Sequence, residues 1–365
     1  MITRQELSRA TLARQLLLER VELDPLEAVE RLAGLQAQTA QTWYGALQSR
    51  LVDFDPALLS DALEQRRAVR AVLMRGTMHL VAARDALEWE PLLRPVVKGV
   101  IMGAIRKALD GVDLEEVTAE GRRALEGAPL TAAELGRLLH TRWPDRDRTA
   151  LADAVRVAFP LVQATPRGLW QRAGAAKLVP LQEWLGAEVA IQPSVDDLVV
   201  RYLAAFGPAS VLDAQAWSGL TRLAEVFDRL RPRLVTMTAP SGRELFDLPD
   251  APRPPGDAPA PVRYLYDFDN VLLSHADRSR FKTRSFFEWA WTMEGPLPSC
   301  LLIDGAVGGT WRIDRDKHRS VLEVRTLDRP GASTQHELEA EGAALLRFWA
   351  PDREHDIRIE LARRS

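Results

Sequence analysis

The sequence has little cysteine and no long apolar run: its single cysteine is Cys300. One cysteine cannot form an internal disulfide, and it cannot build a zinc site or an iron–sulfur cluster on thiolates. The most apolar stretch, 96–105, is interrupted by Lys98 and is too short to span a bilayer. The first residues lack the apolar segment of a secretory signal peptide. We therefore expect a cytoplasmic protein without a membrane partner.

A strong excess of either charge is also missing. The 48 Lys and Arg residues against 51 Asp and Glu give a net charge of −3 at pH 7. This balance excludes a generally basic, histone-like coat, but it permits the local basic track that binding to a polyanion requires. Hydrophobic residues make up 46% of the 365-residue chain, which is ordinary for a globular protein with two or three domains.

The motifs of common hydrolases and nucleoside triphosphatases are absent as well. The glycine-rich segment 305–309 lacks the Lys-Ser/Thr pair of a phosphate loop. No pair of histidines has metal-ligand spacing with a partnering carboxylate. Asp267, Asp269 and Asp277 alone could suggest a divalent ion, but acidic residues at the start of a loop more often stabilise turns. We therefore expect no metal and no cofactor.

What the chain does contain is one pattern used three times: helices followed by a β-hairpin. Each helix of the first unit begins at a capping residue, and the three are Thr3 (with Glu6), Asp24 and Asp55. The first of these helices is predicted over 7–20. Two short strands, 68–73 and 77–81, then turn at Arg75-Gly76. Helices followed by a hairpin is the order of a winged helix.

The same order returns twice further along the chain. A helix capped by Thr131 and another near 149–159 precede the second hairpin. Helices near 195–205, 210–217 and 221–230 precede the third. The predicted hairpin strands are 161–163 with 169–171 in the second unit, and 234–238 with 244–248 in the third.

These patterns predict an α+β fold of three tandem winged-helix units followed by a β-rich C-terminal region. The units are predicted at 1–125, 126–190 and 191–250, and a Pro-rich linker at 249–261 precedes the region 262–365. That last region contains strands near 262–266, 299–304, 307–313, 319–326 and 355–361, and a helix near 334–349.

Winged helices most often bind duplex DNA, and a basic track would support that function. Four cations recur at every second position of one segment with no acid among them: Arg278, Arg280, Lys282 and Arg284. On an extended strand this spacing puts all four on one face, where they could follow successive phosphates. The alternative is an edge strand whose solvated charges prevent aggregation.

A second candidate for DNA binding is a predicted hairpin tip. It carries the cations Arg312, Arg315 and Lys317. Asp314 and Asp316 dilute its charge, although a hairpin tip is well shaped to enter a groove. DNA binding and a merely solvated turn are equally compatible with this composition.

Two glutamines, Gln36 and Gln38, follow the second predicted helix. On composition alone they are typical of a helix surface, and residues two apart on a helix point in different directions. If both serve one site, the helix must end near Gly34 or Leu35 and leave them extended.

Three segments together resemble the AlkZ/YcaQ family of bacterial winged-helix DNA glycosylases. The segments are Gly34-Leu35-Gln36-Ala37-Gln38, 75–81 and 272–280, and the resemblance runs along nearly the whole chain, including 307–311. Each motif alone is weak, but their order and spacing are specific. Gln36-Ala37-Gln38 is similar to the Gln–apolar–Gln motif of the AlkZ-like branch, whereas the YcaQ-like branch has Gln–apolar–Asp.

The resemblance implies a concave channel and excision of alkylated purines, mainly N7-alkylguanine, from double-stranded DNA. In the AlkZ-like branch it extends to unhooking interstrand crosslinks, including those of azinomycin-type antibiotics. Gln36 and Gln38 would hold the attacking water and stabilise the positive sugar. The motifs contain no lysine, so we expect a monofunctional enzyme without Schiff-base chemistry. No obligate protein partner is evident.

Thr77 and His79, in the first predicted hairpin, are candidates for orienting the substrate. His79 could hydrogen-bond the lesion strand or orient the glutamines, and equally it could cap the hairpin. A non-enzymatic winged-helix regulator or damage-binding protein is the alternative to a glycosylase, and a scaffold protein without nucleic-acid contact is a third option.

Overall fold

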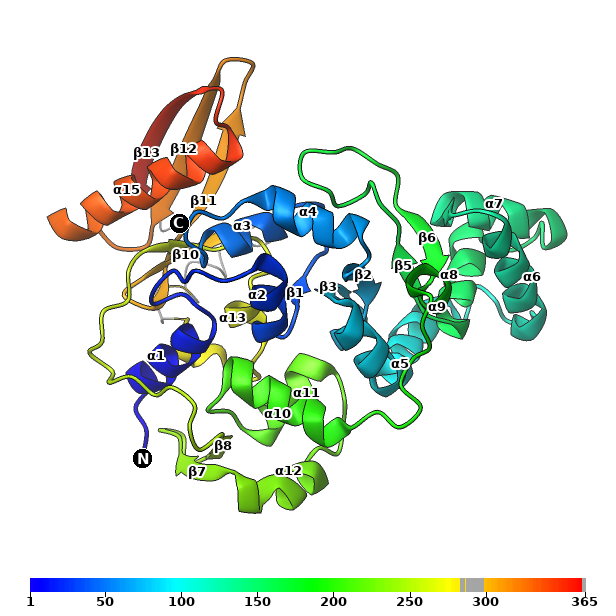
Figure 1. Ribbon diagram of the computed structural model, residues 1–365, viewed down its shortest axis with the longest axis horizontal. Helices are drawn as coiled ribbons and strands as arrows, with labels where there is room; N and C mark the ends of the chain where they lie inside the picture. The colour runs from blue at the N-terminus through cyan, green and yellow to red at the C-terminus, as the bar shows by residue number, and fades with distance from the viewer. Residues whose placement is uncertain (283–285, 287–298, 363–365) are drawn as a thin grey trace.

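The computed structural model describes residues 1–282, 286 and 299–362. Helices and strands are mixed along the chain, which confirms the predicted α+β class. Figure 1 shows the first unit in the middle of the molecule, the second at one end, and the third beside helix α1. Within this described part, no helix is both long enough and apolar enough to cross a membrane.

The first unit contains the helices predicted after Asp24 and Asp55, the predicted hairpin, and a further helix over 43–48 that was not predicted. Its elements are α2 (Pro25–Arg31), α3 (Trp43–Gln48), α4 (Pro56–Glu64), β2 (Ala68–Val72) and β3 (Met78–Ala82). Asp24 and Asp55 cap α2 and α4 by accepting hydrogen bonds from backbone N–H groups, and a proline follows each. A short strand, β1 (Leu35–Gln36), pairs with β3 and extends the hairpin to three strands.

The second unit has one wrongly predicted strand and two helices that were not predicted: one over 114–127, which begins before the predicted boundary at 126, and one over 181–185. Its elements are α6 (Leu114–Gly127), β4 (Leu130–Thr131), α7 (Ala132–Arg142), α8 (Arg148–Ala158), β5 (Leu161–Gln163), β6 (Lys177–Pro180) and α9 (Leu181–Leu185). The partner of β5 is β6, not the predicted strand 169–171. Trp170 packs instead against Tyr44 and Phe348, at ring-centroid distances of 4.9 and 4.8 Å. Long-range aromatic packing therefore replaces local pairing.

The hairpins of the first two units form one sheet. Its strand order is β1-β3-β2-β5-β6-β4, and the pairing of Ala71 with Val162 joins the two hairpins. The helix α5 (Ala83–Ile105) also connects these units and packs on α8. The two units are therefore held together through backbone hydrogen bonds as well as side chains.

The third unit agrees with the prediction to within a few residues. It contains α10 (Val195–Phe206), α11 (Val211–Ser218), α12 (Ala224–Leu230), β7 (Val235–Thr238) and β8 (Glu244–Asp247). The two strands pair with each other and form a separate sheet. All three units thus follow the order expected of winged helices.

The C-terminal region is a five-stranded sheet covered by a helix, with the order β13-β12-β11-β10-β9. Its elements are β9 (Arg263–Tyr264), β10 (Ser299–Ile303), β11 (Ala306–Arg315), β12 (Arg319–Thr326), α15 (Ala332–Trp349) and β13 (Glu354–Leu361). The hairpin of β11 and β12 projects from the rest of the molecule (Figure 1). The predicted strands and helix of this region are confirmed.

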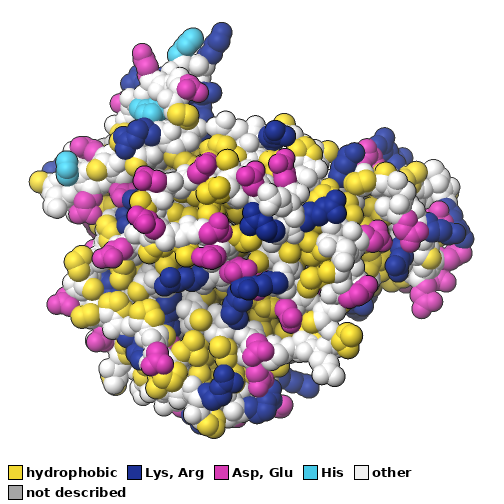
Figure 2. All heavy atoms as spheres, viewed as in Figure 1, with side chains coloured by type: hydrophobic (Ala, Val, Ile, Leu, Met, Phe, Trp, Pro, Cys, Tyr) yellow, Lys and Arg dark blue, Asp and Glu magenta, His cyan; other side chains and the backbone are white. Residues whose placement is uncertain are grey.

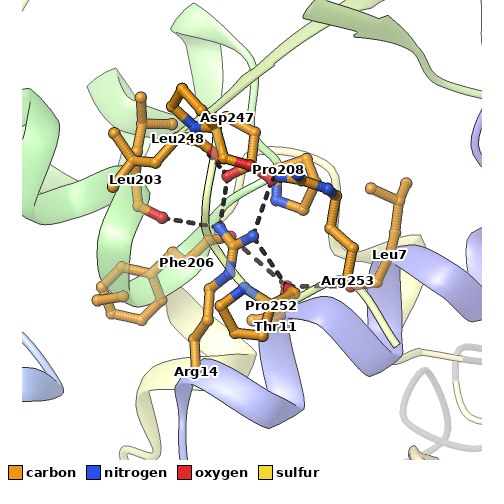
Figure 3. Close-up of polar contacts among 12 residues, drawn as sticks. Leu7, Thr11, Arg14, Leu203, Phe206, Pro208, Asp247, Leu248, Pro252 and Arg253 are labelled. Atoms are coloured by element: carbon orange, nitrogen blue, oxygen red, sulfur yellow. Dashed lines mark hydrogen bonds and ion pairs between the residues drawn. The ribbon is translucent and has the colours of Figure 1, made fainter. Parts of the chain in front are cut away.

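The first helix, α1 (Arg4–Arg14), is shorter than the predicted 7–20. The chain leaves the helix at Leu16, whose φ of 56° is incompatible with a continuing right-handed helix. Arg14 ends α1 in a buried ion pair with Asp247 of the third unit at 2.7 Å. Figure 3 shows the guanidinium directed at this carboxylate and at the Leu203 carbonyl. α1 therefore ties the N-terminus to the third unit.

Candidate active site

Gln36 lies in β1, the edge strand of the six-stranded sheet, and Gln38 follows in a bend just after that strand ends. Helix α2 ends at Arg31, and Gly34 then adopts a left-handed φ of 82°. A Cβ at Gly34 would lie 2.7 Å from the Val81 side chain, so only glycine fits this turn. The helix thus ends where the hypothesis of a shared glutamine site requires it to end.

Gln36 is held at both its side chain and its backbone. Its Oε1 accepts a hydrogen bond of 2.6 Å from Nη2 of Arg75. Its carbonyl accepts a hydrogen bond of 3.1 Å from the Tyr266 hydroxyl, and its backbone pairs with His79. The residue is 5% exposed. These contacts leave the carboxamide little freedom to turn.

Gln38 is exposed, and its side chain is bound to β3, the strand with which Gln36 pairs. Its Oε1 accepts a hydrogen bond of 3.0 Å from the backbone N–H of Met78. Between the glutamines, the Ala37 carbonyl accepts a hydrogen bond of 2.9 Å from Nη2 of the buried Arg70. The segment 36–38 is therefore anchored at each residue.

Both carboxamides present the same end to the protein. A guanidinium and a backbone N–H can only donate, so the atom that each contacts must be the carboxamide oxygen. Each oxygen keeps a second lone pair, with which it can still accept a hydrogen bond from water. Within the described residues, neither amide nitrogen donates a hydrogen bond to a protein group.

Arg75 is the site residue that sequence reasoning missed. It lies in the turn η1 (Met74–Gly76) with a left-handed φ of 56°. Its Nη1 donates a hydrogen bond of 2.6 Å to the carbonyl of Trp217, in the third unit. Burial lowers the pKa of Arg75 to about 10, so it is still charged at neutral pH. Arg75 is the first residue of the motif 75–81, but its partners Gln36 and Trp217 are distant in the sequence.

The predicted substrate-orienting residues contact the hairpin itself. Thr77 donates a hydrogen bond of 3.0 Å to the Met74 carbonyl, and Nδ1 of His79 lies 2.9 Å from the Thr77 carbonyl. His79 is 2% exposed, and burial together with the charge of Arg75 lowers its pKa to about 3. These contacts favour the interpretation in which His79 caps the hairpin.

The buried His79 gives a testable pH dependence. In the unfolded chain His79 has its ordinary pKa of 6.5, whereas in the folded protein its pKa is about 3. Between these two pH values the unfolded chain therefore binds a proton that the folded protein does not bind. The contribution of His79 to the free energy of unfolding is therefore fully present above pH 6.5 and is lost as the pH falls from 6.5 toward 3. His79→Gln should show a smaller drop in urea midpoint between pH 7 and pH 5 than the unmodified protein. An identical drop in both proteins would contradict this assignment.

The predicted basic track has a different structure. Residues Arg278–Arg280 form a 3₁₀ turn, η3, so the cations do not line one face of a strand. Arg280 is 6% exposed and donates to the Thr11 hydroxyl and the Pro208 carbonyl. Lys282 is buried and lies over the Phe286 ring. Only Arg278 of these three is exposed; Arg284 lies outside the described residues.

The cations of the projecting hairpin are on the surface, as predicted. Arg312 forms an ion pair with Glu323 at 2.7 Å, and Arg315 lies over the ring of Trp349. Lys317 is exposed at the hairpin tip. On the face in Figure 2, Lys and Arg side chains are interspersed with Asp and Glu. DNA binding by this hairpin stays a prediction.

The acidic segment near 267–270 supports the glutamine segment. Asp269 caps the short helix α13 (Asn270–Leu273) and forms a fully buried ion pair of 2.8 Å with Arg50. Asn270 donates hydrogen bonds to the carbonyls of Leu32 and Gly34 at 3.2 and 2.7 Å. The expected turn chemistry is confirmed, and its partners stabilise the turn that precedes Gln36.

Comparison with known proteins agrees with this geometry. A family model described as DNA glycosylase AlkZ-like matches residues 29–348. The chain belongs to the AlkZ-like DNA glycosylase family. The structure of this AlkZ-like chain is similar to that of Streptomyces sahachiroi DNA glycosylase AlkZ, with a TM-score of 0.74 and 21% sequence identity. The match covers 98% of this chain and 99% of the other. A comparison with curated proteins found no match.

Membership of the AlkZ-like family makes the protein a DNA glycosylase, as the sequence motifs implied. The matched segment of this AlkZ-like glycosylase includes the glutamines, Arg75 and the projecting hairpin. Among the described residues, no group of three or more His, Cys, Asp or Glu is placed to hold a metal ion.

Proposed function

We propose that this glycosylase hydrolyses the N-glycosidic bond of N7-alkylated purines, above all N7-alkylguanine, in duplex DNA. The observation that carries the proposal is the pair of carboxamides at the edge of the sheet, one in β1 and one in the bend after it. Gln36 and Gln38 are anchored through their oxygens to Arg75 and Met78, and each keeps a lone pair and an amide nitrogen for the substrate.

The chemistry of the lesion makes two amides sufficient. Alkylation at N7 gives the base a positive charge, so it leaves as a neutral molecule and needs no strong acid. The sugar becomes positively charged as the bond breaks, and water attacks its anomeric carbon. A carboxamide is a poor base, but its oxygen can accept a hydrogen bond from this water and fix its direction. No lysine lies in the motifs, and so we propose a monofunctional reaction.

We further propose that the enzyme unhooks N7-linked interstrand crosslinks, such as those of azinomycin-type antibiotics. A crosslinked base is tied to the partner strand and cannot easily be turned into a closed pocket. Gln38 is exposed in the bend that follows the edge strand β1, which is compatible with a bulky lesion. The exposed cations Arg278 and Lys317 are candidates for binding the phosphates.

The test is incubation with a duplex that carries one N7-methylguanine, followed by alkali to cleave abasic sites. We expect strand cleavage at the lesion in the presence of EDTA and none in the undamaged duplex. A crosslinked duplex, run in parallel, should yield separable strands. Tight binding of the lesion duplex without abasic sites would contradict the enzymatic function and support the damage-binding alternative.

A further inference from the structure

Arg75 connects the glutamine motif to the third unit. One nitrogen of its guanidinium donates to Gln36 Oε1 and the other donates to the Trp217 carbonyl, each at 2.6 Å. Assuming the proposed function, we propose that Arg75 is a positioning residue that gives the two glutamines different roles. It holds Gln36 as a hydrogen-bond donor toward DNA and leaves Gln38 as the acceptor that directs the water.

Arg75 fixes the orientation of the Gln36 carboxamide. Because the guanidinium has no acceptor atom, a carboxamide bound to it must present its oxygen and turn its amide nitrogen away. The side chain is 5% exposed, so its conformation is restricted by packing as well. In the described part of the chain, Nε2 of Gln36 meets no acceptor, and its two hydrogens are left for a substrate oxygen or nitrogen.

Arg75 also polarises the Gln36 carboxamide through its charge. A hydrogen bond from a charged donor is stronger than one from a neutral donor, and hydrogen bonds in series polarise one another. Arg75 therefore weakens the Gln36 oxygen as an acceptor and strengthens its amide nitrogen as a donor. Gln38 receives only a neutral backbone N–H, at 3.0 Å, so its oxygen is the better acceptor for water.

Arg75 is itself held in place by its backbone conformation and by its neighbours. Its left-handed φ of 56° is an uncommon conformation for a residue with a side chain. The turn after α11 approaches it closely: a Cβ at Gly219 would lie 3.3 Å from the Arg75 Cα and 2.7 Å from the Val96 side chain. Within the described residues, Arg75 forms no ion pair with a carboxylate. The guanidinium of Arg75 is therefore held against the Gln36 carboxamide and the Trp217 carbonyl by its hydrogen bonds.

The experiment is a pair of double-mutant cycles, measured as single-turnover excision of N7-methylguanine from duplex DNA. Arg75→Met should slow excision by roughly 10-fold or more in the unmodified enzyme, because contacting residues are strongly coupled. In a Gln36→Ala background it should cause almost no further loss. In a Gln38→Ala background it should keep its full effect. Equal losses in both backgrounds would overturn the proposal.

Arg66→Met is a matched control for the loss of an arginine. Arg66 also has a left-handed φ, of 60°, and it donates a hydrogen bond of 2.9 Å to a tryptophan carbonyl, that of Trp184. It contacts neither glutamine, so excision should stay at the unmodified rate. A loss equal to that of Arg75→Met would show a general structural effect and overturn the proposal. Urea unfolding of each variant measures its stability independently of excision.

Gln36→Glu tests the direction of the hydrogen bond. Glutamate keeps an oxygen for Arg75 but removes the amide nitrogen, so excision should fall as far as in Gln36→Ala. Excision at the unmodified rate would show that the nitrogen is dispensable and would overturn the proposal. These outcomes differ from a failure of the proposed function, in which the unmodified enzyme itself leaves N7-methylguanine in place.

Discussion

Replacing Gln36 and Gln38 together with alanine is expected to slow excision of N7-methylguanine by at least roughly 100- to 1,000-fold, the usual effect of removing even one group that stabilises a transition state. The substitutions remove both carboxamide oxygens and both amide nitrogens. Neither side chain is charged, so the phosphate contacts that dominate duplex affinity stay in place. Affinity for the lesion duplex should therefore change little. Single-turnover kinetics and a binding titration at one salt concentration measure the two effects separately.

Gln41→Ala is the matched control for this loss. Gln41 lies three residues after Gln38, and both ends of its side chain are bound to the loop between β5 and β6. Its Nε2 donates to the Arg172 carbonyl at 2.9 Å, and its Oε1 accepts from Gln171 at 3.1 Å. We expect excision close to the unmodified rate in this variant. Unchanged excision in the Gln36 and Gln38 double variant would remove the catalytic assignment.

Asp247→Ala is expected to destabilise the fold by about 3–5 kcal/mol, the cost of removing one partner of a buried ion pair. The side chains of Arg14 and Asp247 are 1% and 0% exposed, so the guanidinium would be left without its counter-charge in the interior. Asp247 is the last residue of β8, and it also binds Arg253, at 2.7 Å. The free energy of unfolding in urea, compared with that of the unmodified protein, measures the loss.

Two further variants make this prediction specific. The double variant Arg14→Met with Asp247→Leu removes both charges, and it should lose less stability than Asp247→Ala because no unpaired Arg14 charge stays buried. Arg122→Ala breaks an exposed pair with Glu126, 3.4 Å long, and should have little measurable effect. A urea midpoint of Asp247→Ala equal to that of the unmodified protein would contradict the role of the pair.

Local signals in the sequence located most elements. The capping box of Thr3 and Glu6 and that of Thr131 and Glu134 both form and begin helices where predicted. The first and third hairpins were also located, because alternating apolar residues and turn residues are adjacent in the chain. Such signals depend on neighbours within a few positions, and these the sequence displays directly.

The errors arose where distant contacts decide the structure. Trp170 was assigned to a strand, but it packs on rings from the first unit and from α15. Arg280 was expected to face phosphates, but the Thr11 hydroxyl and the Pro208 carbonyl hold it inside. Alternating charges describe a strand only if a partner strand is present, and the turn at 278–280 has none.

The glutamine segment was found through its motif, and the end of the helix before Gly34 followed from the condition that both side chains share one site. Its supporting contacts were not predictable. Arg75, Tyr266 and Asn270 reach the segment from 39, 230 and 236–238 residues away in the chain. No periodicity or spacing in the sequence reports such pairings, which appear only once the units pack together.

The placement of α1 has a consequence for the order of folding. Ser8 donates to the Gly305 carbonyl, and Arg9 donates to the Asp304 carbonyl, contacts that span 297 and 295 residues. A ribosome therefore releases this helix long before the chain that covers it has been synthesised. Because these contacts join segments far apart in the chain, α1 can reach its final position only after the C-terminal segment that covers it has been synthesised. Until then, its apolar residues and the arginines Arg9 and Arg14 lack the partners that bury them in the folded protein.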